Sequence, residues 1–342
     1  MLMAAILVPV AAFGAVLIWR FSELERNHYR DDALQIAQQA SATIDREIVG
    51  YIAASEALAV SPALQAGGDL ASFASEVQGL LRTRGSYLSV HDRNGQQIID
   101  STRPFGTGSP VANDPVLRDV DQKVFATGKP AVSDLFSAAA AQRLLVTIAV
   151  PVFRGDAVTH VLNMSVEPQH FGDVLADAAP PGITLSLVDG RDRVIARSQR
   201  SAEFVGRTAT AGFVHAATGA RGTWMGSRID GTPVLGAYVR SGLSGWRIGV
   251  GVPLAIIEAP VRRLMLVIGT VTVIVFLISG LLANEAARSI TRPLALLGLT
   301  ADRLGRGQTV SPLQTGLREI DQVSRAIAHA GRAIRERESE LQ

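Results

Sequence analysis

The sequence contains no cysteine and very little lysine. Without cysteine the chain can form neither a disulfide bond nor a thiolate zinc site, and a cysteine nucleophile is excluded. Because such a chain tolerates an oxidising or a reducing compartment, its location has to follow from other features. The only lysines are Lys123 and Lys129, and a formal net charge of +2 is too small to indicate a nucleic-acid partner.

Sequence patterns that carry catalysis or bind metals are also missing. The chain has no nucleophile elbow, no phosphate-binding loop and no dinucleotide fingerprint. None of the histidines has a second ligand at zinc spacing; they are His28, His91, His160, His170, His215 and His329. We therefore expect no catalytic residue, no cofactor and no metal site within this chain. His329 is followed by Ala330 rather than by an acidic residue, so we do not assign it as a phosphoacceptor.

Charged residues are absent from two long apolar segments, Met1–Trp19 and Leu264–Ala283. The second segment, as a helix, reaches roughly 30 Å, the thickness of a hydrocarbon core. We predict that residues 264–283 and residues 1–19 are both transmembrane helices. A cleaved signal peptide is the alternative for the first, but the segment lacks a basic n-region and is longer than a typical signal-peptide core.

Arginines flank both predicted spans, so charge alone does not decide the orientation. Arg20 and Arg30 follow the first span, and Arg262 and Arg263 precede the second. Long translocated loops escape the positive-inside rule, whereas short tails obey it. The tail after the second span carries Arg288, Arg292, Arg303 and Arg306. We therefore predict a multi-pass membrane protein, with residues 20–263 periplasmic or extracellular and residues 284–342 cytoplasmic.

From Phe21 to about Leu58 the pattern is that of one long amphipathic helix. The segment has no proline and a single glycine, and apolar or small residues recur at alternating spacings of three and four. These residues are Leu34, Ala37, Ser41, Ile44, Ile48, Tyr51, Ser55 and Leu58. We expect this helix to continue the first membrane helix outward and to pack along a domain or against a second copy of itself.

Beyond Gly85 the period changes to that of strands, and one pattern occurs twice. Leu88–Asp92 leads through a polar turn into Ile98–Ser101, and Leu185–Asp189 leads in the same way into Ile195–Ser198. Two copies of one domain are the simplest account. Further strands are expected at residues 143–153, 158–166, 223–229, 234–240 and 246–252, and a connecting helix at 167–179. The dipeptide Asp230–Gly231 predicts a type I′ hairpin turn.

A long helix followed by two repeated antiparallel lobes in one external loop resembles the double Cache sensor domain, a PAS-like fold. The stretch Thr147–Val152 is similar to the central strand of the family's distal lobe. The resemblance implies an α+β fold in which residues 20–84 form the long helix and lead-in. Residues 85–179 would form the membrane-distal PAS-like lobe and residues 180–260 the membrane-proximal one.

The tail resembles a HAMP domain over residues 284–338, which is a parallel coiled coil. Two apolar seams carry the likeness: Ile290, Leu294, Leu297, Ala301, Leu304 and then Ile320, Val323, Ile327, Ala330, Ile334. Pro293 falls in a first helical turn, where its missing N–H costs little. The resemblance implies that the signal is relayed through Ile290, Pro293, Leu297, Glu319 and Ile327, and that the chain is a homodimer.

In the resembling family a small ligand binds in the distal lobe. The polar residues on or beside the strands expected there are Asp100, Arg103, Asp134, Arg143 and Thr147, which we take as candidate ligand-binding residues. Surface charges at strand edges are the alternative for each of them. The aromatic cluster with arginine that binds amino acids in some family members is absent apart from Arg143, so an amino-acid ligand is not favoured.

Together with the two resemblances, these features predict a transmembrane signal receptor of the bacterial inner membrane. Ligand binding in the external lobes would move the second span, and the HAMP domain would pass the motion to a cytoplasmic output. The expected output is a two-component histidine kinase acting on a response regulator, beyond residue 342. A diguanylate cyclase or a chemoreceptor is the alternative output. A membrane-anchored binding or scaffold protein without an output enzyme, or an external hydrolase, are the other classes considered.

Overall fold

The computed structural model describes residues 2–65, 68–81, 86–106, 114–138, 143–286, 288, 292–306, 311 and 321–330. The chain divides into two compact units, Met1–Val261 and Arg262–Gln342. The first unit contains a long helix and two antiparallel sheets, and the second is helical. Each unit is described by itself.

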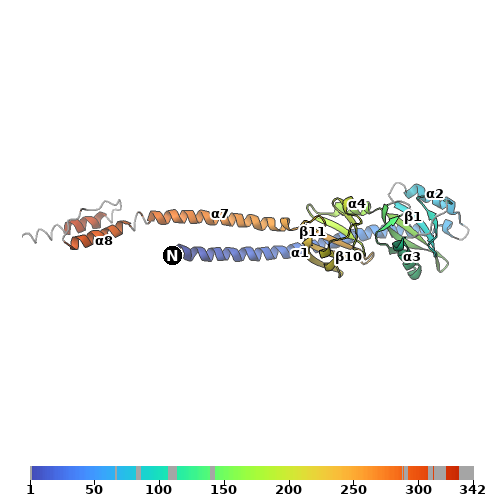
Figure 1. The fold of residues 1–342 in the computed structure, drawn as a ribbon, viewed down its shortest axis with the longest axis horizontal. Coiled ribbons are helices and arrows are strands. Elements are labelled where there is room, and N and C mark those ends of the chain that lie inside the picture. The colour runs from blue at the N-terminus through green and yellow to red at the C-terminus, as the bar shows by residue number, and fades with distance from the viewer. Residues whose placement is uncertain are drawn as a thin grey trace, which may run out of the picture. The chain divides into compact units, whose positions relative to one another are not determined.

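A single long helix, α1 (Leu2–Ala59), runs through the first unit, and both sheets of this unit pack against it (Figure 1). The predicted seam is its buried stripe: Ala37, Ile44, Ile48 and Ser55 are almost fully buried. This stripe packs against strands of both sheets, so the predicted seam contacts the chain's own lobes. The predicted long N-terminal helix is therefore confirmed. The predicted first span, 1–19, lies within α1, and its side chains lie outside the described residues.

The first sheet, here called the distal sheet, has the strand order β2-β1-β6-β5-β3, with β4 paired to β5. Its strands are β1 (Ser86–Asp92), β2 (Gln97–Asp100), β3 (Ala131–Val132), β4 (Phe136–Ala138), β5 (Arg143–Arg154) and β6 (Ala157–Val166). The accompanying helices are η1 (Pro62–Leu64), α2 (Leu70–Leu81) and α3 (Pro115–Thr127).

The second sheet, here called the proximal sheet, has the strand order β8-β7-β11-β10-β9. Its strands are β7 (Thr184–Val188), β8 (Val194–Arg197), β9 (Arg221–Ser227), β10 (Pro233–Arg240) and β11 (Arg247–Pro253). The helices are α4 (Pro168–Ala178), α5 (Ser201–Phe204) and α6 (Ala211–Ala216). The repeat read from the sequence corresponds to the hairpins β1–β2 and β7–β8, and every predicted strand is present.

The expected type I′ turn at Asp230–Gly231 does not form. Gly231 has a φ of 83°, but among the described residues Asp192 and Arg200 are the only non-glycine residues with positive φ. The loop instead runs from Arg228 to Thr232, because the Asp230 carboxylate accepts a hydrogen bond from the Thr232 backbone N–H at 3.1 Å. This Asx-type turn lets Asp230 keep a negative φ, so its backbone avoids the strained left-handed conformation.

Each sheet has an inner face toward α1 and an outer face. Alternate residues of the distal strands, such as Leu88, Ile148 and Leu162, join the core that contains α1, as do Leu187 and Ile248 of the proximal strands. The outer faces carry separate, smaller apolar clusters, beneath α3 in the distal lobe and beneath α6 in the proximal lobe. The site candidates lie on these outer faces and between the two lobes.

In the second unit, the predicted span 264–283 falls within α7 (Leu254–Ala286), which follows β11 without an intervening loop. Among the described residues this is the one helix long and apolar enough to cross a membrane. Its large apolar side chains are exposed; Leu266, Phe276 and Leu281 are examples. An exposed apolar surface of this length requires a lipid environment or another helix to cover it.

Of the predicted relay residues, three lie in described helices and two do not. Pro293 is in the first turn of α8 (Arg292–Gly305), and Leu297 of this helix is buried. Ile327 is partly buried in a helix over residues 321–330. Ile290 and Glu319 lie outside the described residues. The parallel coiled coil therefore stays a prediction.

Candidate functional site

The five residues predicted to bind ligand do not form one cluster. Asp100, at the end of β2, accepts hydrogen bonds from the backbone N–H and hydroxyl of Thr102 at 2.9 and 2.6 Å. Arg103 approaches the same carboxylate at 3.9 Å, with its side chain 39% exposed. Asp100 and Arg103 therefore close a turn at the edge of the distal sheet.

Arg143 lies elsewhere, at the start of β5, and its side chain is 59% exposed. It donates to the Glu167 carboxylate at 2.5 Å, and the Tyr87 hydroxyl donates to the same oxygen at 2.9 Å. Burial, followed by this hydrogen bond to Glu167, raises the pKa of Tyr87. The three side chains join β1, β5 and the start of α4 by a polar contact near the surface.

The outer face of the distal sheet, here called the distal polar face, is the strongest ligand-site candidate in this lobe. Its first row is Tyr87, Ser165 and Thr147, which lie opposite one another on β1, β6 and β5. The Thr147 and Ser165 hydroxyls are 3.0 Å apart, and Thr147 is fully buried. Ser89 and Asn163 follow in the next row. Polar groups are costly on a buried sheet face, so their concentration here is a functional signal.

Three buried side chains form a hydrogen-bonded cluster at this face: His91 of β1, Asp121 of α3 and Asn163 of β6. The His91 Nδ1 lies 2.7 Å from one Asp121 oxygen, and the Asn163 amide donates to the other at 2.8 Å. The Ser89 hydroxyl is 2.9 Å from His91 Nε2. Since Asp121 accepts a hydrogen bond from the Nδ1–H of His91, we assign the Nε2 of His91 as the acceptor for the Ser89 hydroxyl. The Asn163 carbonyl oxygen is buried and has no partner among the described residues, so it offers an acceptor.

This cluster was missed from the sequence because α3 was not predicted. The signals for α3 are nevertheless present: the Asp114 side chain accepts from the Val116 N–H at 2.9 Å, proline follows at the first helical position, and Gly128 ends the helix with a φ of 63°. Those features are a standard N-cap and C-cap. These signals predict the helix, whereas the contact of Asp121 with β1 and β6 follows only from the tertiary structure.

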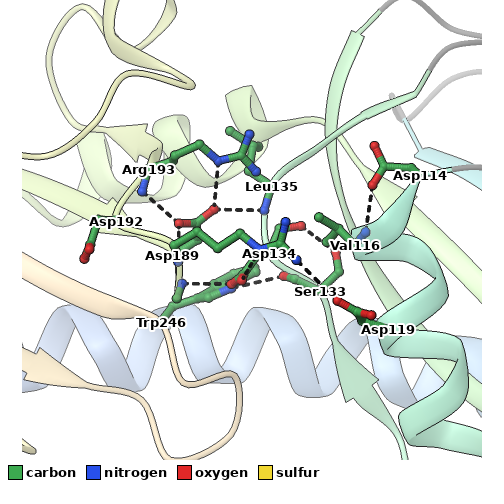
Figure 2. A network of polar contacts seen from close by, with 12 residues as sticks. Asp114, Val116, Asp119, Ser133, Asp134, Leu135, Asp189, Asp192, Arg193 and Trp246 are labelled. Carbon is green, nitrogen blue, oxygen red and sulfur yellow. Dashed lines mark hydrogen bonds and ion pairs between the residues drawn. The ribbon is translucent and has the colours of Figure 1, made fainter.

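The two lobes are joined by a buried polar contact, here called the lobe junction (Figure 2). Asp189, at the end of β7, is fully buried and accepts a hydrogen bond from the Leu135 N–H of the distal lobe at 3.1 Å. It also accepts from the backbone of Arg191 and Arg193 at 2.9 and 2.8 Å, which shapes its own turn. Burial raises the pKa of Asp189, and the backbone N–H bonds offset this only in part.

A reciprocal contact runs from the distal lobe to the proximal one. Asp134, a predicted ligand residue, accepts from the Gly190 N–H at 2.8 Å and lies beside Asp189 in Figure 2. The Trp246 indole donates to the Ser133 carbonyl at 3.2 Å, and Trp246 is fully buried. Asp134 therefore belongs to the junction rather than to the distal polar face.

The junction connects the distal polar face to the last strand of the proximal lobe. Thr147 donates its backbone N–H to the Ser133 hydroxyl at 2.8 Å, and Ser133 in turn contacts Trp246. Trp246 immediately precedes β11, and β11 runs directly into the apolar helix α7. A continuous set of packed and hydrogen-bonded groups thus leads from the predicted residue Thr147 to the segment preceding the span.

Comparison with known proteins supports the fold. No protein-family model matches the sequence. No curated protein matches it. Among solved structures, the sensory domain of the chemoreceptor Tlp3 of Campylobacter jejuni is similar with a TM-score of 0.52 at 12% identity, covering 69% of this chain and 98% of that one.

Two Pseudomonas structures give the same result. The ligand-binding domain of the amino acid chemoreceptor PctB of Pseudomonas aeruginosa, in complex with arginine, has a TM-score of 0.51 at 17% identity and covers 69% of this chain and 92% of that one. The ligand-binding domain of CtaA of Pseudomonas fluorescens, in complex with serine, has a TM-score of 0.52 at 15% identity, covering 67% and 99%. At these identities the likeness shows the fold, which is that of chemoreceptor sensory domains, and it confirms the predicted helix with two antiparallel sheets.

Proposed function

We propose that this protein is a transmembrane receptor that binds a small polar molecule in its distal lobe and relays the event across the membrane. The main support for this proposal is that α7 begins at the residue after the end of β11. The last strand of a sensory fold continues without a loop into the one described helix able to span a bilayer. A displacement of β11 would therefore act on the span itself.

The distal polar face is the proposed ligand site. It combines hydroxyls, a buried His–Asp–Asn cluster and the Asn163 carbonyl oxygen, which has no partner in the part of the chain that the structure describes. Groups of this kind bind polar ligands by directed hydrogen bonds. The neighbours in complex with amino acids support a small ligand of this general size. Arg143, the one residue that remains of the amino-acid-binding pattern, donates to the Glu167 carboxylate. We therefore propose a small polar ligand without assigning it to the amino acids.

The proposed relay runs through the lobe junction. A ligand that prefers one arrangement of β5 and β6 would shift Ser133, and through it Trp246 and β11. Such coupling is typically worth about 1–3 kcal/mol and requires a difference in ligand affinity between two states. The HAMP-like segment after α7 would convert the motion of the span into altered helix packing, in a homodimer of the inner membrane.

The proposed output is a two-component histidine kinase with its response regulator, and a diguanylate cyclase or chemoreceptor signalling domain is the alternative. The HAMP-like arrangement of Pro293 and Leu297 in α8 is compatible with each of them. Attaching residues 1–342 to each kind of output domain and assaying the activity with ligand would separate these outputs.

The test begins with a thermal-shift screen of the full chain in nanodiscs against small metabolites. Any compound that stabilises the protein is then measured on Asn163→Ala, which removes the free acceptor, with Ser137→Ala on the exposed position of β4 as the control. The proposal expects weaker binding to Asn163→Ala and unchanged binding to Ser137→Ala. If the compound bound equally well to both variants, the distal polar face would not be its binding site.

Relay is tested with the same compound by disulfide crosslinking. Because the chain has no native cysteine, single cysteines placed along residues 264–283 are the only thiols. The proposal expects the crosslinking pattern between two copies to change with the ligand. A pattern that stays constant for every binding compound would contradict the relay and would favour a membrane-anchored binding protein.

A further inference from the structure

The proximal lobe contains a cavity on its outer sheet face, away from both the distal polar face and α1. Its volume is ≈ 60 Å³, counted as space for the centre of a water-sized sphere. Because one water needs about 10–15 Å³ on this measure, the cavity holds roughly four to six non-hydrogen atoms. This is the size of a short organic acid rather than of a nucleotide or a sugar.

Glycines create the hollow. Gly249 and Gly251, two residues apart on β11, both line the cavity and so leave the same face of this strand without side chains. A Cβ on Gly249 would lie 2.9 Å from the Phe213 ring, so this position must be glycine for α6 to pack. A Cβ on Gly251 would meet Arg228 and Val234 only at ordinary contact distances of 3.4 and 3.6 Å. The second glycine is therefore not required by packing, and it keeps the cavity open.

Two of the residues that line the cavity each carry a buried hydrogen-bond donor without an acceptor among the described residues. The Nη1 of Arg197 and the Nε1 of Trp224 are both buried and without a partner in the part of the chain that the structure describes. Arg197 is 3% exposed, so water does not readily compensate for the missing acceptor. A buried N–H group without an acceptor is energetically unfavourable, so two such groups on residues of one cavity indicate an absent acceptor-bearing group.

The charges around the cavity leave a surplus of positive charge. Arg197 and Arg228 both line it, and Asp230 pairs with each of them, at 2.8 and 3.3 Å. Burial would raise the pKa of Asp230, but hydrogen bonds from Arg197 and Thr232 outweigh it and hold this pKa well below its ordinary value. Two guanidinium groups thus face one carboxylate, and the exposed Arg200 is also 3.6 Å from the same carboxylate.

The orientation of Arg197 is fixed before any ligand arrives. Its guanidinium lies over the Phe204 ring, with the Cζ 4.2 Å from the ring centroid, and its Nη2 is held by Asp230. The remaining Nη1 is thus presented by a rigid group, which lowers the entropy lost on binding. Apolar side chains, including Val188, Val194 and Phe213, line the rest of the cavity.

We propose that this cavity is a second binding site, which takes a small monocarboxylate whose oxygens accept from Arg197 Nη1 and Trp224 Nε1 and whose short apolar tail lies against the valines. Its floor is β11, the strand that continues into α7, so the occupant touches the proposed relay directly. The site goes beyond the proposed function, because it does not use the distal polar face.

The test uses sodium propionate, which has five non-hydrogen atoms, and isothermal titration calorimetry on the full chain in nanodiscs. Propionamide serves as the uncharged control. Sodium chloride at equal ionic strength tests whether the site binds an adventitious ion only. The proposal expects saturable binding of propionate, binding of propionamide weakened at least about tenfold, and no effect of chloride.

Three variants locate the binding. Trp224→Phe keeps an aromatic ring and removes the N–H donor, and Gly251→Ala narrows the cavity with a methyl group that meets only ordinary contacts. Gly212→Ala adds a methyl group in α6 where no atom lies within 4 Å. Propionate affinity should fall about tenfold in the first, be lost in the second and stay unchanged in the third. Melting temperatures of all three should remain close to that of the parent protein.

Binding that is equally tight in Trp224→Phe and Gly251→Ala, or absent in the parent protein, would overturn the proposal. Binding reproduced by chloride would do the same. Asn163→Ala separates this inference from the proposed function. If Asn163→Ala still binds propionate, the proximal cavity is a site independent of the distal polar face. If Asn163→Ala no longer binds propionate, an independent proximal site is contradicted.

Discussion

Replacement of Asp189 tests whether the two lobes are held together by the polar contacts of the lobe junction. The carboxylate is fully buried and accepts three backbone N–H groups, from Leu135, Arg191 and Arg193. In Asp189→Ala all three lose their acceptor. At about 1–3 kcal/mol for each buried unsatisfied group, and with partial rescue by water in the turn, we expect a loss of about 3–5 kcal/mol in the free energy of unfolding.

Asp189→Asn separates the turn from the junction. The amide oxygen can keep the bonds from Arg191 and Arg193, which both reach Oδ1, while the amide nitrogen replaces the oxygen that accepts from Leu135. The lost cross-lobe bond predicts a smaller destabilisation of about 1–2 kcal/mol. Asp156→Asn, in the exposed turn between β5 and β6, is the matched control and should change stability by less than about 0.5 kcal/mol.

Urea unfolding of the full chain in detergent micelles, followed by tryptophan fluorescence, provides the measurement. Trp246 is buried at the junction and donates to Ser133, so its emission should shift to longer wavelength in Asp189→Asn before global unfolding. If Asp189→Ala proves no more destabilising than Asp156→Asn, the junction does not hold the lobes and the proposed relay through it fails.

Three further substitutions test other parts of the proximal and distal lobes. In Gly236→Ala the new Cβ would lie 2.4 Å from the Trp224 ring, so we expect a loss of about 1–3 kcal/mol in chemical unfolding. Asp230→Asn leaves buried Arg197 without its charged partner, and we expect a loss of about 3 kcal/mol at pH 7. The pKa of Asp230 is lower in the folded protein than in the unfolded chain, where it is about 3.9. The ionised carboxylate therefore stabilises the fold fully above a pH of about 3.9, and this stabilisation is lost as the pH falls below that value. The unfolding curves of variant and parent should consequently converge in acid. Gly128→Ala has space for its methyl group but keeps a φ of 63°, and a loss of about 1 kcal/mol in melting experiments would reflect backbone strain alone.

Much of the fold follows from local patterns. The stripe on α1, the duplicated hairpins and the strands of both sheets were predictable because burial on one face imposes a period of 3.6 or 2 on the sequence. The short helices α2 and α3 were not predicted, although Asp114 and Gly128 cap α3 in the standard way. The turn at Asp230 was predicted wrongly, because its carboxylate bonds to Thr232 and Arg197 rather than permitting a local type I′ geometry.

The candidate sites depend on contacts between distant segments. Asp134 and Thr147 were selected as polar residues near the correct strands, yet one is bound to Gly190 of the other lobe and the other contributes to a buried hydroxyl pair. Asp100 and Arg103 lie at the edge of the distal sheet and pair with each other, and Arg143 lies at the start of β5 and pairs with Glu167. No periodic pattern distinguishes a carboxylate that caps a turn from one that crosses a lobe boundary, because both occupy the same place along a strand.

The sequence by itself determined the apolar span, the long helix, the duplicated sheets and the absence of thiol chemistry, since each depends on composition or on spacing along one element. The tertiary structure alone decided which polar groups meet: His91 with Asp121 and Asn163, and Asp189 with Leu135. It also brought two residues whose buried donors have no partner among the described residues to one cavity over β11. The physical reason is that the energy of a buried polar group depends on its partners in space, which come from strands and helices far apart in the chain.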